Sequence, residues 1–118
     1  MDLDQAVQAH SQWKKKLADY LAKRDGSLIP AELSMDNKCP LGQWIYGEGA
    51  AKFSQLPEFP TLKREHTRFH KAVGDVVRNA DSGKSITEEI ALGSKSEFGA
   101  ASSAVVTAIL NLKARVPK

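Results

Sequence analysis

Three histidines and one cysteine are the residues of this sequence whose types and spacing suggest chemistry. His66 and His70 are four residues apart, so on a helix they project from one face, about one turn from each other. Two imidazoles in that arrangement can bind one metal ion at about 2.0–2.1 Å each. The only other histidine is His10 and the only cysteine is Cys39, and these two would complete a tetrahedral set. Imidazole and thiolate are the donors that zinc prefers, so the sequence predicts a three-histidine, one-cysteine zinc site.

His10 and Cys39 each have an ordinary structural interpretation as well. His10 lies within an apolar stripe, where a lone histidine is more often a core residue satisfied by a hydrogen bond. Cys39 precedes Pro40, which suits the first position of a helix and would make the cysteine an N-cap. The free N–H groups and the dipole at that end favour a thiolate, which binds metals and reacts with oxidants. A buried, inert cysteine that packs as a small hydrophobe is the alternative, and this stretch alone leaves both open.

Hydrophobic periodicity predicts two long amphipathic helices that carry the histidines. Apolar residues recur at steps of three and four over residues 3–23 and again over residues 57–80. Residues 28–38 contain proline, asparagine and aspartate, and they predict a connection with at most one short turn of helix. His10 falls on the apolar face of the first helix, and the His66–His70 pair falls on that of the second.

A short helix and a last long helix complete the predicted fold. The short helix starts after Cys39, and Gly47-Glu48-Gly49 is expected to break or loosen it. The last helix is expected over residues 86–114, with Ser85 as its N-cap and Glu88 completing a capping box. The expected architecture is therefore all-α, an antiparallel four-helix bundle with an additional short helix that carries the cysteine, formed as a single domain by residues 1–118.

Composition narrows the possible functions. The 118 residues carry a formal charge of +3, and the one compact basic run, Lys14-Lys15-Lys16, is better explained as a solvated helix face than as a nucleic-acid site. A single cysteine rules out an intramolecular disulfide. No apolar run approaches the length of a membrane span, and the first residues lack the features of a signal peptide, so we expect a cytoplasmic protein without membrane insertion.

Other kinds of metal protein fit the sequence less well. A di-iron bundle needs several inward carboxylates and Glu-x-x-His motifs, and no such motif is present. A zinc hydrolase of the His-Glu-x-x-His type is excluded because Thr67 stands where the glutamate should be. Four protein ligands would also leave no open position for water, so we expect no enzymatic activity. The remaining rival is a structural or adaptor bundle in which the histidines are merely buried.

Three motifs resemble one known family. His10-Ser11-Gln12-Trp13, then Cys39-Pro40-Leu41-Gly42-Gln43-Trp44, then His66-Thr67-Arg68-Phe69-His70 are similar to the pattern H-x-x-W, C-x-[LF]-G-x-W, H-x-x-F-H of the chemoreceptor zinc-binding domain. The resemblance implies a helical bundle that tends to form homodimers. It also implies one zinc ion held at the positions of His10, Cys39, His66 and His70, and a Cys39 that is reactive toward oxidants such as hypochlorous acid.

The same resemblance implies a sensory role. Members of the family sit on soluble bacterial chemoreceptors and on diguanylate cyclases, so either module is an expected partner. We expect four further residues to pack around the ligands without binding the metal, namely Trp13, Gly42, Trp44 and Phe69. A non-catalytic adaptor or dimerisation bundle with a structural zinc is the alternative.

Overall fold

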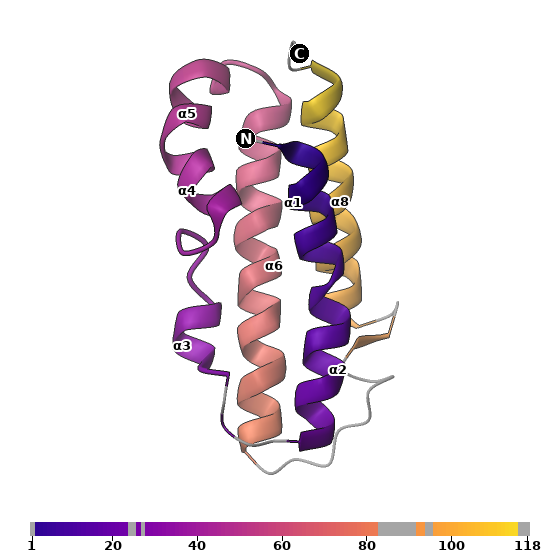
Figure 1. Ribbon diagram of the computed structural model, residues 1–118. Coiled ribbons are helices and arrows are strands. Elements are labelled where there is room, and N and C mark those ends of the chain that lie inside the picture. Colours follow the sequence, from indigo (N-terminus) through magenta and orange to yellow (C-terminus); the bar gives the residue numbers. More distant parts are fainter. Residues whose placement is uncertain (1, 24–25, 27, 83–91, 94–95, 116–118) are drawn as a thin grey trace.

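A computed structural model describes residues 2–23, 26, 28–82, 92–93 and 96–115. Within these ranges the chain is helical and has no strand, which confirms the predicted all-α bundle (Figure 1). The helices are α1 (Leu3–Ser11), α2 (Trp13–Lys23), α3 (Pro30–Leu33), α4 (Pro40–Tyr46), α5 (Glu48–Phe53), α6 (Glu58–Asp81) and α8 (Glu97–Arg115).

Helix α6 occupies the middle of the bundle, between two flanking layers (Figure 1). On one side lie α8 and the continuous rod of α1 and α2, which are separated only by the turn residue Gln12. On the other side the three short helices α3, α4 and α5 fill the fourth position of the bundle. Along the chain each pass runs opposite to the one before it: the α1–α2 rod descends, α3 to α5 ascend, α6 descends and α8 ascends (Figure 1).

The last helix begins later than its apolar pattern predicts. Gly93 and Ser96 are not helical, and α8 starts at Glu97 because Ser96 caps it: the Ser96 hydroxyl oxygen accepts from the Gly99 N–H at 2.9 Å. The continuous helix expected over residues 86–114 is therefore wrong around residue 93. The predicted cap at Ser85 and capping box at Glu88 lie outside the described residues.

The glycines after the short helix also act differently from the prediction. Only Gly47 interrupts the helix, since Glu48 starts α5 at once and Gly49 lies inside it. A Cβ atom at position 49 would lie 2.8 Å from the Trp44 ring. Gly49 is therefore tolerated in the helix because it lets the ring of Trp44 pack against the α5 backbone.

The core is built mainly from the apolar faces of α6 and α8. Phe69 packs on Phe98 across that interface, with ring centroids 5.7 Å apart, and both side chains are buried. At the far end of α2, the Tyr20 hydroxyl donates a hydrogen bond to Asp81 at 2.6 Å. None of the described helices combines the length and the apolar character that crossing a bilayer would take.

Candidate metal centre

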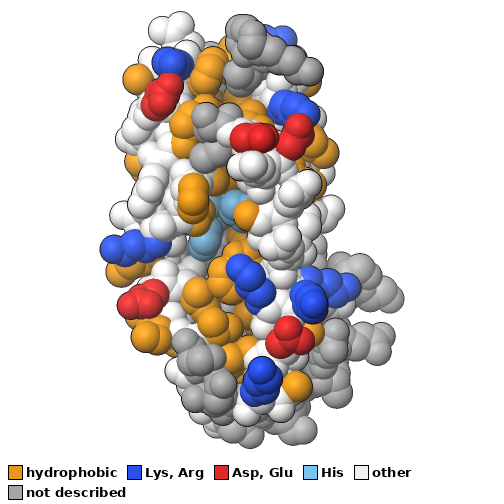
Figure 2. Space-filling view, viewed as in Figure 1, with side chains coloured by type: hydrophobic (Ala, Val, Ile, Leu, Met, Phe, Trp, Pro, Cys, Tyr) orange, Lys and Arg blue, Asp and Glu red, His pale blue; other side chains and the backbone are white. Residues whose placement is uncertain are grey.

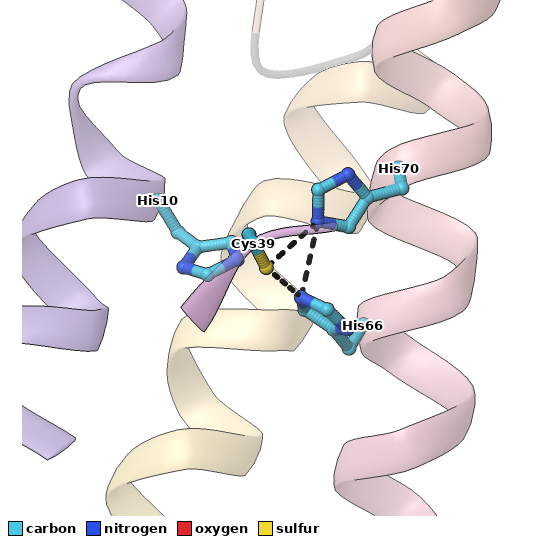
Figure 3. A group of neighbouring side chains, drawn as sticks. All are labelled: His10, Cys39, His66 and His70. Carbon is cyan, nitrogen blue, oxygen red and sulfur yellow. Dashed lines mark hydrogen bonds between the residues drawn. The ribbon is translucent and has the colours of Figure 1, made fainter. Parts of the chain in front are cut away.

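Three separate parts of the fold bring the four candidate donors together. His10 comes from α1, His66 and His70 come from α6, and Cys39 lies at the N-terminus of α4 (Figure 3). One ligand atom from each of the four lies within 4.8 Å of all the others. The close-up shows Cys39 between the His10 ring on one side and the two α6 rings on the other (Figure 3). The convergence that the sequence suggests is therefore present.

The spacing of three of the four donor atoms is close to the edges of a zinc tetrahedron. His66 Nε2 lies 3.0 Å from His70 Nε2, and Cys39 Sγ lies 3.3 and 3.5 Å from these two nitrogens. With zinc bonds of 2.0–2.1 Å to nitrogen and 2.3 Å to sulfur, the edges of a tetrahedron are about 3.3 Å for N–N and about 3.6 Å for N–S. These three distances differ from the ideal edges by at most about 0.3 Å, so Cys39, His66 and His70 could hold an ion with little rearrangement. The fourth donor, His10, lies within 4.8 Å of them and would have to move inward to bind the same ion.

Backbone carbonyls orient two of the rings. His10 Nδ1 lies 2.7 Å from the carbonyl oxygen of Ala6, and His70 Nδ1 lies 3.0 Å from that of Leu33. Because a carbonyl only accepts, both Nδ1 atoms carry the proton, and both Nε2 atoms direct a lone pair at the cluster. His10 Nε2 is buried and has no hydrogen-bond partner. A bound cation is the natural partner for that lone pair, so the residues present fit a metal ion.

Burial keeps the three imidazoles neutral. His66 is fully buried, and His10 and His70 are 3% and 5% exposed. Desolvation lowers the pKa of all three, and for His66 the neighbouring His70 and His10 add to the effect, so that its pKa is about 3. Neutral imidazole is the form that binds a metal, so no proton has to leave a histidine near pH 7.

Cys39 caps α4 as its sequence context predicts, but its acidity differs from the expectation. The Gly42 N–H donates to Cys39 Sγ at 3.3 Å, and Pro40 occupies the first helical position. Burial nevertheless raises the pKa of the Cys39 thiol, and this outweighs the lowering by the backbone N–H groups around it. The backbone N–H groups at the helix terminus do lower the pKa of Cys39, as expected, but in the metal-free chain burial has the larger effect. A bound cation would supply the missing positive charge.

Asp36 is a charged neighbour of the site that the sequence interpretation missed. Its carboxylate accepts hydrogen bonds of 2.5 Å from the hydroxyls of both Tyr46 and Thr67. Burial by itself would raise the pKa of Asp36, but these two hydrogen bonds and the nearby His66 and His70 lower it overall. Its negative charge therefore lies close to the cluster, where it would balance the +1 charge left when a thiolate binds Zn²⁺. No motif marks it, because only the fold brings residue 36 over α6.

Two glycines allow the segment that carries Cys39 to approach its neighbours closely. A Cβ atom on Gly42 would lie 1.6 Å from the carbonyl oxygen of Asp36, which is impossible without moving backbone. A Cβ atom on Gly74 of α6 would lie 2.0 Å from the Ser34 hydroxyl. Residues 34–36 therefore cross directly over α4 and α6, and their backbone contact with Gly42 holds the start of α4, with Cys39, near the two α6 histidines.

The aromatic residues expected around the ligands lie at different distances from the cluster. Phe69 contacts it directly, with its ring centroid 5.1 Å from that of His10. Trp13 is partly buried beside His10 and Cys39 and lines a pocket with them. The ring contacts found for Trp44 are with Phe53 of α5 and with Phe59 in the first turn of α6, at 5.8 and 6.2 Å, and neither is with a donor ring.

A bundle in which three histidines and one cysteine converge belongs to the class of metal-binding helical domains. The sequence model of the chemoreceptor zinc-binding domain matches residues 10–77, which is more than half of the chain and includes all four donors. The chain belongs to this family, which is one of regulatory sensor domains. Neither a curated protein nor a solved structure matches the chain.

Proposed function

We propose that this protein is a sensory domain that holds one zinc ion per chain through His10, Cys39, His66 and His70. The observation that carries the proposal is the convergence of these four donors, within 4.8 Å, from three segments far apart in the sequence. Family membership supports zinc over other metals, as does the chemistry of three imidazoles and one thiol. With four protein donors the site is closed, which suits a structural or regulatory ion and does not suit catalysis.

Zinc in this position would cross-link α1, the start of α4 and α6. Each segment also has its own restraint: Ala6 and Leu33 orient two of the imidazoles, and Asp36 fixes the loop before Cys39 through Thr67 and Tyr46. The Cys39 end is the weakest of the three, because a single short helix and its preceding loop hold it. Loss of the metal or oxidation of the Cys39 sulfur is therefore expected to release α4 first and to change the shape of the bundle.

Family membership suggests what the domain senses and which proteins it acts on. We propose that the chain acts in the bacterial cytoplasm, as a homodimer, on a chemoreceptor or a diguanylate cyclase, and that it senses zinc, an oxidant such as hypochlorous acid, or both. The family name associates the domain with chemoreceptors. Size-exclusion chromatography with light scattering tests the dimer, and a mass of one chain at micromolar concentration would refute it.

Metal content tests the zinc proposal directly. Protein purified without a histidine tag should contain about one zinc per chain by elemental analysis, and Cys39→Ala and His66→Ala should each abolish tight binding. Circular dichroism should show that both variants stay helical. Lys71→Ala is the matched control, since Lys71 is exposed on α6 next to His70 and should leave the affinity unchanged. Wild-type affinity in either donor variant would refute the ligand assignment.

The same analysis separates the rival functions. A chain that purifies without metal and does not bind added zinc would favour a bundle in which the histidines are merely buried. A chain that contains iron and absorbs visible light would favour an oxygen-binding bundle. A zinc ion that stays bound when oxidants are added would favour the adaptor with a structural zinc. Comparing the shape of the bundle before and after oxidation tests this alternative.

A further inference from the structure

A pocket of about 230 Å³ lies beside the four donors, between α1 and the N-terminus of α4. Its walls include Gln5, Ala9 and Trp13 on one side and Pro40 on the other, and both His10 and Cys39 line it. An apolar cavity of about 150 Å³ already holds benzene, so this one has room for a small organic molecule. Figure 2 shows histidine side chains within a hollow in the face of the molecule that it presents.

The pocket lies on the His10 side of Cys39, opposite the two α6 histidines. Elsewhere the sulfur is in contact with His66 Nε2 at 3.3 Å, His70 Nε2 at 3.5 Å and the Gly42 N–H at 3.3 Å. Those contacts cover the sides toward α6 and α4. Cys39 is only partly buried and lines the pocket together with His10, so a reagent in the pocket would reach the sulfur past the His10 ring.

The chemistry of the walls selects what can enter. The walls are mostly small or apolar, and Asp2, which is exposed, is the one acidic residue among those that line the pocket. Asp2 is held in place by capping α1, because it accepts from the N–H groups of Asp4 and Gln5 at 2.9 and 3.2 Å. A fixed negative charge on the lining of the pocket repels anions, and apolar walls disfavour their desolvation.

We propose that this pocket is the entrance through which small, uncharged electrophiles reach the Cys39 sulfur, and that its volume and the Asp2 carboxylate exclude bulky and anionic reagents. The inference rests on the proposed function only for the signal that the reaction would produce. The access of reagents to the sulfur is a property of the chain itself. The pocket would then select which oxidants and other electrophiles react with Cys39.

Alkylation of the metal-free full-length chain tests the route, because Cys39 is the single cysteine. With iodoacetamide the sulfur forms a bond to carbon, iodide leaves with the electron pair, and the thiol proton passes to solvent. The second-order rate constant is measured by mass spectrometry for the wild type, Ala9→Leu and Gln5→Leu. Both positions are exposed on α1, so neither change should disturb folding. Filling the entrance should slow the reaction roughly tenfold.

Two comparisons make that result specific. Ala51→Leu, at an exposed position of α5 remote from the pocket, should react within about twofold of the wild type. Iodoacetate, an anion of nearly the same size, should be disfavoured more by the protein than by free cysteine. Asp2→Asn keeps the cap but removes the charge, so it should reduce this extra discrimination by roughly threefold.

The outcomes separate this inference from the zinc proposal. If Ala9→Leu and Gln5→Leu both react at the wild-type rate, the sulfur is reached by another route and the inference is refuted, whatever the zinc content. If the two variants are slowed but the chain binds no zinc, the pocket stands and the metal proposal fails. In the zinc-loaded chain, Ala9→Leu should also slow the release of zinc by hypochlorous acid, measured with a chromophoric chelator.

Discussion

Replacing Gly42 by alanine should damage the metal centre although it adds a single methyl group. The new Cβ would lie 1.6 Å from the carbonyl oxygen of Asp36, 2.7 Å from its carbonyl carbon and 3.1 Å from Asn37 Cα. Since a carbon and a carbonyl oxygen approach no closer than about 3.3–3.6 Å, the loop must retreat by about 2 Å. A metal site tolerates changes of only about 0.2 Å in its bond lengths, and this loop leads directly into Cys39.

Two opposing effects determine how much Gly42→Ala changes the stability of the metal-free chain. Alanine in place of glycine within a helix gains about 1 kcal/mol of propensity, whereas forcing a methyl group into a closed contact costs typically 1–3 kcal/mol. We therefore expect a modest loss of stability in the metal-free chain. Displacement of Cys39 and of the Asp36 charge should weaken zinc binding by about 10- to 100-fold, which is the usual effect of disturbing the residues that orient metal ligands.

Competition with a chromophoric chelator measures the affinity, and thermal unfolding of the metal-free chain measures the stability. Gly74→Ala is the matched control, because its Cβ would meet the Ser34 hydroxyl at 2.0 Å and a side chain can rotate away. The nearest backbone atom there, Pro30 O, is 3.2 Å distant, so zinc affinity should stay within about threefold of the wild type. Wild-type affinity in Gly42→Ala would refute the reasoning that the loop crossing positions Cys39.

Three further predictions follow from the charges around the site. The metal-free chain should lose stability below about pH 6.5, because His66 protonates there in the unfolded chain but only near pH 3 in the folded one. Urea unfolding should show a loss of about 1.4 kcal/mol at pH 5.5 from this side chain, and equal stability at pH 7.5 and 5.5 would contradict it. Zinc binding at pH 7 should release about one proton, from Cys39, because the pKa of its thiol is raised while the histidines are already neutral. Calorimetry in buffers of different ionisation enthalpy measures the number of protons released, and a value of zero would mean that Cys39 is already a thiolate. Asp36→Asn should weaken zinc binding about tenfold while the Tyr46 hydroxyl keeps its partner, and an unchanged affinity would mean that this carboxylate has no electrostatic role.

The parts of the fold that follow from local pattern were predictable. Helix periodicity placed Phe69 and both α6 histidines on a buried face, and the proline after Cys39 located the start of α4. The count of donors then gave the composition of the site, because the chain has no other histidine or cysteine. These features depend on residues that are neighbours in sequence or on one helix face.

The features that sequence could not give depend on contacts between distant segments. Gly49 stays helical because the ring of Trp44 fills the space beside it, which no local rule for glycine includes. The acidity of Cys39 is decided by burial, and the helix terminus is the smaller effect. Asp36 reaches the cluster because Gly42 has no Cβ atom, which lets the backbone of the loop cross closely over α4.

X-ray absorption at the zinc edge of the metal-loaded chain tests the central claim most directly. We predict a four-coordinate ion with three nitrogen ligands at about 2.0–2.1 Å and one sulfur ligand at about 2.3 Å. The sulfur contribution should disappear in Cys39→Ala. A spectrum of the wild-type chain without sulfur, or with only oxygen and nitrogen ligands, would contradict the claim that these four side chains share one ion.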